Sequence, residues 1–218
     1  MKHRLFEEIE KFKTWSRQLD QTPEDERTGK WERTYAGWNA VDAAFIDFVS
    51  KSNPADWTEE VAGALLYLIA RDHASEIFAD LVAAHPDKLQ FLARQAADAG
   101  SPAGKWQLVV RLPELGDPEL AESLLLRFIN DPDAYVRRRT LQTLAAIRSG
   151  RTEHYCEVAW QRPGPQQLDQ RMAVLETLFK INSPKLPYYL EEAHRDGNPG
   201  LVKYAGEIEK KIEQPGEQ

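Results

Sequence analysis

The chain has 218 residues and a formal charge of −7, with 42% hydrophobic and 29% charged residues, a composition compatible with a folded protein that has a well-solvated surface. No apolar run approaches the roughly 18 residues that a membrane-spanning helix needs, and the acidic residues near the N-terminus do not fit a signal peptide. The single cysteine, Cys156, excludes an intramolecular disulfide and a cysteine-based zinc site. We therefore expect a cytoplasmic protein that binds no membrane.

The first half of the chain predicts three helices. Apolar residues at helical spacing indicate a first helix over residues 3–19 and a second over residues 31–51. The polar stretch 20–30 between them contains a proline and a glycine, which predicts a loop. Asp56 is expected to cap the third helix, with Glu59 three residues later in a capping-box arrangement.

Six prolines follow residues of the types that cap helices, which predicts short helices that begin at sharp corners. The pairs are Asn53-Pro54, Ser101-Pro102, Asp117-Pro118, Asp131-Pro132, Ser183-Pro184 and Asn198-Pro199. Helical patterns continue to the end of the chain, and we find no alternating pattern typical of a strand. We expect a polar, frayed tail over residues 214–218.

The second half contains an internal repeat of helical hairpins. Its anchors are the last apolar residues of alternate helices, at spacings of 32, 34 and 31 residues: Leu115, Ile147, Ile181 and Ile212. Seven residues before each anchor stands a second position in the same register: Leu108, Thr140, Val174 and Ala205. A hairpin of this kind needs a neighbour to bury its apolar face.

The segment 131–144 resembles the HEAT-repeat consensus, with an Asp-Pro corner, a Val136-Arg137 pair and small or apolar residues at the core positions. Thr140 and Val174 stand where the HEAT family usually has alanine. In that family the arginine pairs with an acid at the corner, so we expect Arg137 to bind Asp131 or Asp133.

The resemblance implies one all-α domain, a right-handed α-solenoid of about five HEAT-like helical hairpins with an N-terminal helical cap. The cap covers residues 1–52 and the repeats cover residues 55–213. In such a hairpin the second helix lines the concave surface, and its non-core positions are candidates for partner binding. Arginine and aromatic side chains often dominate interface energies. The expected partner-binding residues are Trp106, Arg111, Tyr135, Arg138, Arg139 and Gln142.

The sequence contains no recognisable catalytic or metal-binding motif. The five histidines are scattered, and no Gly-rich phosphate loop, nucleophile elbow or zinc-binding HExxH occurs. We therefore expect no catalytic residue, no cofactor and no metal.

The sequence favours a non-enzymatic protein-interaction module, since solenoids offer an extended binding surface. Residues 1–100 carry 12 basic and 18 acidic side chains, so a basic protein partner is favoured and nucleic acid is not. An immunity protein that neutralises a toxin is the narrower hypothesis. A subunit scaffold, an assembly factor and a homo-oligomer stay open.

The alternative is an enzyme, a HEAT-like alkylpurine DNA glycosylase. Members of that family are typically basic and carry a tryptophan followed four residues later by a catalytic aspartate. Here Trp106 is followed at that distance by Val110, which cannot stabilise the positive charge of a breaking glycosidic bond. The acidic balance also opposes binding to duplex DNA.

Overall fold

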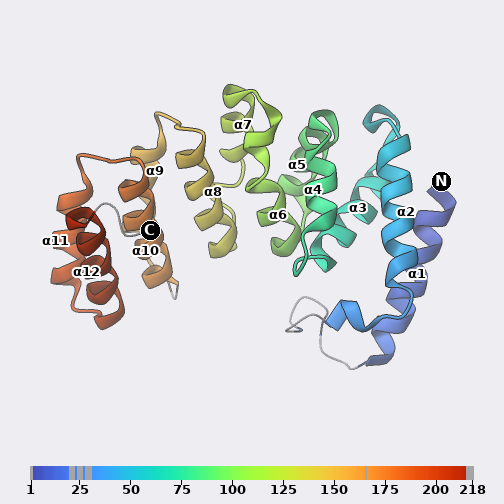
Figure 1. Cartoon of the computed structure of the whole chain (residues 1–218), viewed down its shortest axis with the longest axis horizontal. Helices are drawn as coiled ribbons and strands as arrows, with labels where there is room; N and C mark the ends of the chain where they lie inside the picture. The colour runs from blue at the N-terminus through green and yellow to red at the C-terminus, as the bar shows by residue number, and fades with distance from the viewer. Residues whose placement is uncertain (1, 20–22, 24–26, 28–30, 165, 215–218) are drawn as a thin grey trace. The chain divides into compact units, whose positions relative to one another are not determined.

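The computed structural model describes the chain except for residues 1, 20–22, 24–26, 28–30, 165 and 215–218 (Figure 1). The described residues form helices and no strand, which confirms the prediction of an all-α protein. No helix among them is long and apolar enough to cross a membrane. The chain divides into two compact units, Met1–Leu124 and Leu125–Gln218, which we describe one at a time. The single domain with a cap over residues 1–52 stays a prediction.

The first unit is built from helices that begin and end at short corners. Its α-helices are α1 (Lys2–Leu19), α2 (Trp38–Lys51), α3 (Glu59–Arg71), α4 (Ile77–Ala83), α5 (Pro86–Ala99), α6 (Pro102–Val109) and most of α7 (Pro118–Leu125). Short 3-10 helices among the described residues join them, including η2 (Trp31–Thr34), η3 (Pro54–Asp56) and η4 (Leu112–Leu115). Helix α3 packs against α1, α5 and α6, and α2 packs against α1 and α4.

Aromatic side chains fill much of the core of this unit. Phe12 is fully buried, and its ring lies 5.3 Å from that of Trp38 and 5.8 Å from that of Trp31. Phe45 and Phe78 stack with 4.1 Å between their ring centroids. Burial of such large rings supplies much of the hydrophobic free energy of a small unit, which explains the tryptophans in this part of the chain.

Two expected helix starts in the first unit are wrong. The second helix begins at Trp38, because Trp31–Thr34 forms a separate 3-10 helix. Helix α3 is capped by Thr58, whose Oγ1 accepts a hydrogen bond from the backbone N–H of Val61. Asp56 instead ends the 3-10 helix before it. The expected loop over residues 20–30 lies mostly outside the described residues.

The second unit contains α8 (Ala134–Ala146), α9 (Thr152–Gln161), α10 (Gln167–Lys180), α11 (Leu186–Asp196) and α12 (Pro199–Glu213). Helix α10 packs against the other four, and α11 packs against α12. Its core is mostly aliphatic, with Leu141, Leu175, Leu178 and Ala205 among the fully buried residues, and it also contains Trp160. Cys156 lies in this core, and burial raises the pKa of its thiol to about 12.

Residues at one position of the sequence repeat are buried in every repeat. The four residues that stand seven positions before the anchors are all fully buried: Leu108, Thr140, Val174 and Ala205. Thr140 is accommodated because its hydroxyl donates to the carbonyl oxygen of Val136 at 2.8 Å. The anchors themselves are poorer core markers, since Ile212 is 47% exposed.

Helices α8 and α10 end in the same way. Arg148 and Asn182 both adopt left-handed backbone conformations, with φ of 55° and 51°. The next backbone N–H in each case returns to the helix, from Ser149 to the Leu144 carbonyl and from Ser183 to the Leu178 carbonyl. This is a Schellman ending, and it occurs twice at the repeat spacing.

The corner before α8 differs from the prediction. Asp133 is the N-cap of that helix, and its Oδ1 accepts from the backbone N–H of Val136 at 3.0 Å. Asp131 is two residues earlier and accepts from the backbone N–H of Asp133 at 2.9 Å. Each aspartate therefore accepts a hydrogen bond from one backbone N–H near the corner, and the helix begins two residues after Pro132.

Candidate functional site

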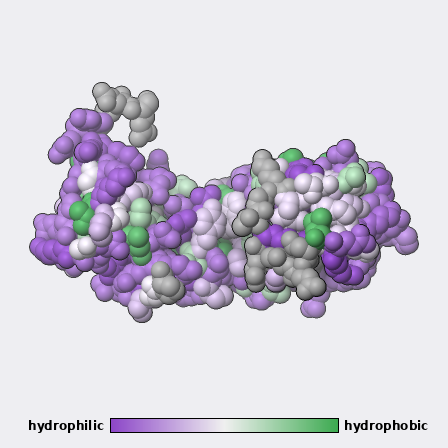
Figure 2. Space-filling model, turned by 90° about the horizontal axis from the view of Figure 1, so that it is seen from below, coloured by the Kyte–Doolittle hydropathy of each residue, from purple (hydrophilic) through white to green (hydrophobic). Residues whose placement is uncertain are grey.

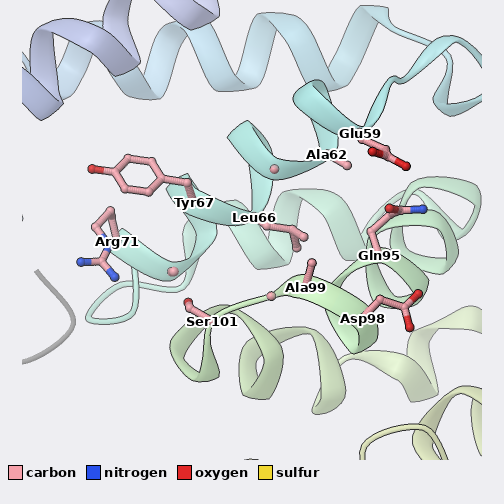
Figure 3. Close-up of a pocket in the computed structure, with 12 residues that line it drawn as sticks. Glu59, Ala62, Leu66, Tyr67, Arg71, Gln95, Asp98, Ala99 and Ser101 are labelled. Carbon is pink, nitrogen blue, oxygen red and sulfur yellow. The ribbon is translucent and has the colours of Figure 1, made fainter.

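A groove in the first unit is lined by α3 and by the junction of α5 with α6. It encloses about 570 Å³ and opens to solvent. In Figure 3, Glu59, Gln95 and Asp98 lie at one end, whereas Tyr67, Arg71 and Ser101 lie at the other. The remaining lining residues are small or apolar: Ala62, Gly63, Leu66, Ala70, Ala99 and Gly100.

Glycines shape this groove. A Cβ added at Gly63, in the middle of α3, would meet nothing within 4 Å, so the space above α3 is left open by the missing side chain. A Cβ at Gly104 would lie 3.3 Å from the carbonyl oxygen of Leu66 and 3.6 Å from the Cβ of Ala70. Gly104 therefore lets α6 approach α3 closely beneath the groove.

The exposed charge of the groove is negative. Glu59 lies in the first turn of α3, and its carboxylate makes no hydrogen bond or ion pair with another described residue. Asp98 is also exposed. Arg71, at the opposite end, is only 5% exposed, and its guanidinium lies 5.6 Å from the ring centre of Tyr67.

A second group of polar residues is buried beside α2. Arg33 binds Asp72 at 2.7 Å and lies 3.8 Å from Asp42. Burial raises the pKa of both carboxyls, and it also raises the pKa of Glu32, which lies 3.5 Å from the ring of His73. Perturbed carboxyls of this kind are typical of active sites, but structural networks produce them too.

The geometry of this group fits a structural role. The second oxygen of Asp72 accepts from the backbone N–H of Phe78 at 3.0 Å, so Asp72 fixes the turn that leads into α4. None of these carboxyls lines the groove. Within the described part of the chain, no group of three or more histidine, cysteine, aspartate or glutamate residues is placed to hold a metal.

Of the six expected partner-binding residues, two belong to the first unit. Trp106 is half-buried in α6. Arg111 is 6% exposed, and its guanidinium binds Asp80 at 2.6 Å and Glu76 at 2.9 Å. Arg111 therefore ties the end of α6 to α4, and it is not available on the surface as the expected patch requires.

The other four expected residues lie together in the second unit. Arg138 stacks over the ring of Tyr135 at 4.9 Å, and Arg139 lies 5.7 Å from the same ring. Tyr135 is 39% exposed. Arg139 donates to the side-chain oxygen of Gln142 at 3.3 Å. We call these four residues the Tyr135 face.

Two neighbours of the Tyr135 face, Glu176 and Tyr204, were not identified from the sequence. Gln142 donates to Glu176 on α10 at 2.9 Å, and Glu176 also binds Lys180 at 2.8 Å. The pKa of Tyr204, on α12, is raised by burial and by Glu176, and the positive charge of Arg138 opposes that rise. Gln142 and Glu176 are 34 residues apart, so the repeat spacing was the signal that pairs them.

Arg137 is structural, as expected, but it uses different partners. Its guanidinium donates to the backbone carbonyl oxygens of Asp131 and Pro132, at 2.7 and 2.8 Å. Both carbonyls belong to the corner before α8. The arginine therefore closes this corner through the backbone instead of through a carboxylate.

Polar side chains cover most of the molecular face in Figure 2, and the apolar ones form small, separate groups. The large apolar residues that are exposed come from several different helices, and they include Leu19, Ile46, Ile77, Val158 and Tyr188. Recognition at such a surface depends on a few specific side chains. Comparison of the chain with protein-family models, with curated proteins and with solved structures found no match.

Proposed function

We propose that this chain is a non-enzymatic protein-interaction module and that the Tyr135 face contacts its protein partner. The observation that supports the proposal most is the environment of the Arg138 side chain. Its guanidinium lies over the exposed ring of Tyr135, and it makes no hydrogen bond or ion pair with another described residue. An arginine held in this way keeps all of its N–H donors for a partner.

The chemistry of the face favours a carboxylate as the group that Arg138 binds. A guanidinium presents parallel N–H groups that match the two oxygens of a carboxylate. The ring below it restricts the side chain, so less conformational entropy is lost when a partner binds. Gln142 and Glu176 join α8 to α10 beside this pair, which gives the face a rigid base.

We propose further that the hairpins of each unit stack in the HEAT-like manner that the sequence resembles. The full burial of the four residues in register, and the identical endings of α8 and α10, support this. An immunity protein is the narrower form of the proposal. It is tested by the identity of the partner, which should then be a toxin.

The test is a charge reversal at the centre of the face. A photoreactive amino acid in place of Tyr135 identifies a partner by crosslinking, and the affinity of that partner for the uncrosslinked protein is then measured. Arg138→Glu should weaken binding by about 1–2 kcal/mol, the range for a lost charge-assisted contact. Its melting temperature should stay close to that of the wild type, because Arg138 is only half-buried and makes no hydrogen bond or ion pair with another described residue.

Lys211→Glu is the matched control, because Lys211 is exposed near the end of α12 and the change in net charge is the same. It should leave affinity unchanged. Equal affinities for the two variants, or unfolding of Arg138→Glu, would contradict the assignment of Arg138 to the interface.

A further inference from the structure

We infer that the groove between α3 and the α5–α6 junction is a second docking site, which takes a basic segment of a protein partner. This site belongs to the first unit, and it does not depend on the Tyr135 face. Three observations lead to it: the space above Gly63, the sign of the charge around that space and the charge of the unit that contains it.

The space above Gly63 is the first observation. A glycine inside a helix is unfavourable compared with alanine, and here no neighbour excludes a side chain, since a Cβ would meet nothing within 4 Å. A larger residue at this position would occupy part of the groove, whose volume is about 570 Å³. That volume lies within the range of sites that hold several side chains or a small ligand.

The second observation is the sign of the charge at the open end. Glu59 has no partner for its carboxylate among the described residues, and Asp98 lies at the same end of the groove (Figure 3). Arg71 is buried at the far end. An incoming lysine or arginine would therefore meet the carboxylate of Glu59, in the negative field that Asp98 adds, and no exposed cation among the lining residues.

The third observation is the charge of the whole unit. Residues 1–124 carry 14 basic and 22 acidic side chains, a balance of −8, whereas residues 125–218 carry 14 and 13, a balance of +1. The field of the first unit attracts cations towards this groove and repels nucleic acid. It also repels a second copy of the same unit, so a basic protein segment is the favoured occupant.

The floor of the groove suits the stem of a long basic side chain. Ala62, Leu66 and Ala99 present apolar surface between the two ends. Lysine and arginine bury their aliphatic stems on such surface while the charged head stays at a polar edge. A basic residue lying over Gly63, with its head at Glu59 and Asp98, satisfies both parts of the lining.

The test uses the full chain and a labelled peptide of lysine, alanine and leucine, about twelve residues long to match α3. A twin peptide carries glutamate in place of lysine. Fluorescence anisotropy should show binding of the lysine peptide only, and the affinity should fall as salt is added. Gly63→Leu places a side chain in the groove without changing the charge, and it should weaken binding by at least about tenfold.

Two matched controls separate the groove from general attraction to an acidic protein. Gly206→Leu makes the same change in α12, where a Cβ also meets nothing within 4 Å, and it should bind the peptide like the wild type. Glu59→Gln should weaken binding. Glu60→Gln removes the neighbouring carboxylate, which binds Lys2 and does not line the groove, and it should have little effect.

The proposal is overturned if Gly63→Leu binds the lysine peptide as well as Gly206→Leu does, or if the glutamate peptide binds equally. It is also overturned if light scattering shows a wild-type dimer that Gly63→Leu dissociates, since the occupant is then a second copy. Thermal unfolding of Gly63→Leu establishes that the variant is folded. Arg138→Glu should leave peptide binding intact, so failure of this site and failure of the Tyr135 face are distinguishable.

Discussion

Gln142 on α8 donates a hydrogen bond of 2.9 Å to Glu176 on α10, the residue that occupies the same position one repeat later. Two residues at equivalent positions of the sequence repeat therefore touch, and α8 and α10 pack against each other. The same spacing relates Leu144 to Leu178, both fully buried. The spacing of the sequence repeat is thus also the spacing of residues that meet between α8 and α10.

The paired endings of α8 and α10 predict different responses to glycine. A residue other than glycine in the left-handed region costs about 1–2 kcal/mol, and asparagine tolerates it better than most. Arg148→Gly should therefore stabilise the protein by about 0.5–1 kcal/mol, and Asn182→Gly should stabilise it less. Urea unfolding measures both, and a loss of stability in Arg148→Gly would contradict the assigned backbone conformation.

The corner and the core of α8 give a second prediction. Leu144 is fully buried, so Leu144→Ala should destabilise by about 2–4 kcal/mol through the cavity that it leaves. Asp133→Ala removes the N-cap and should cost about 1 kcal/mol. If chemical denaturation ranked Asp133→Ala as the more damaging change, the placement of Leu144 in the core would be wrong.

Three of the helical glycines, Gly63, Gly104 and Gly206, should respond to alanine according to the space around each one. Gly63→Ala and Gly206→Ala should each stabilise by about 0.5–1 kcal/mol, because alanine favours the helix and the added Cβ meets no neighbour. Gly104→Ala should destabilise, because its Cβ lies 3.3 Å from a backbone oxygen of α3. Melting temperatures suffice as the measurement, and equal shifts in all three variants would contradict the close approach of α6 to α3.

Replacing either of two aspartates of α2, Asp42 or Asp47, by asparagine should change the stability at neutral pH in opposite directions. Burial raises the pKa of Asp42, so folding is penalised once pH rises above the pKa of the unfolded chain. Asp42→Asn should therefore be more stable than the wild type at pH 7, and the difference should shrink towards about pH 3, where Asp42 is protonated. Arg33 and Asp72 act on the same carboxyl, with opposite signs.

Asp47 is the control for this prediction. A hydrogen bond with Lys51 lowers its pKa, so its contribution is present at neutral pH and is lost in acid. Asp47→Asn should be slightly less stable than the wild type at pH 7. Urea unfolding at both pH values gives the sign for each variant, and the same sign for both would contradict the assigned environments.

Local patterns in the sequence predict much of this fold. Helical spacing indicates α1 almost to the residue, and the repeat register identifies the fully buried positions Thr140 and Val174. Helix starts are predicted less well, because several residues near one corner are of types that can cap a helix. Thr58 is the cap where Asp56 was expected, and Asp133 is the cap where Asp131 was expected.

Features that depend on distant residues are not visible in the sequence. The arginine at position 111 looks like a surface residue until its partners on α4, more than thirty residues away, are in place. The carboxyl group of Asp72 is buried and accepts a hydrogen bond from Arg33, 39 residues earlier. The groove has one local sign, a glycine in the middle of α3, but its opposite wall comes from the α5–α6 junction.

The burial of Cys156 has a practical consequence. Only the thiolate reacts with maleimides, and a thiol with a pKa of about 12 in a fully buried side chain supplies almost none of it at neutral pH. A cysteine introduced at an exposed position, such as Lys211, should therefore take up a fluorophore or a spin label selectively in the folded protein. The native cysteine can stay in place during such experiments. Because Cys156 becomes accessible when the protein unfolds, the rate at which it is labelled in denaturant reports global unfolding.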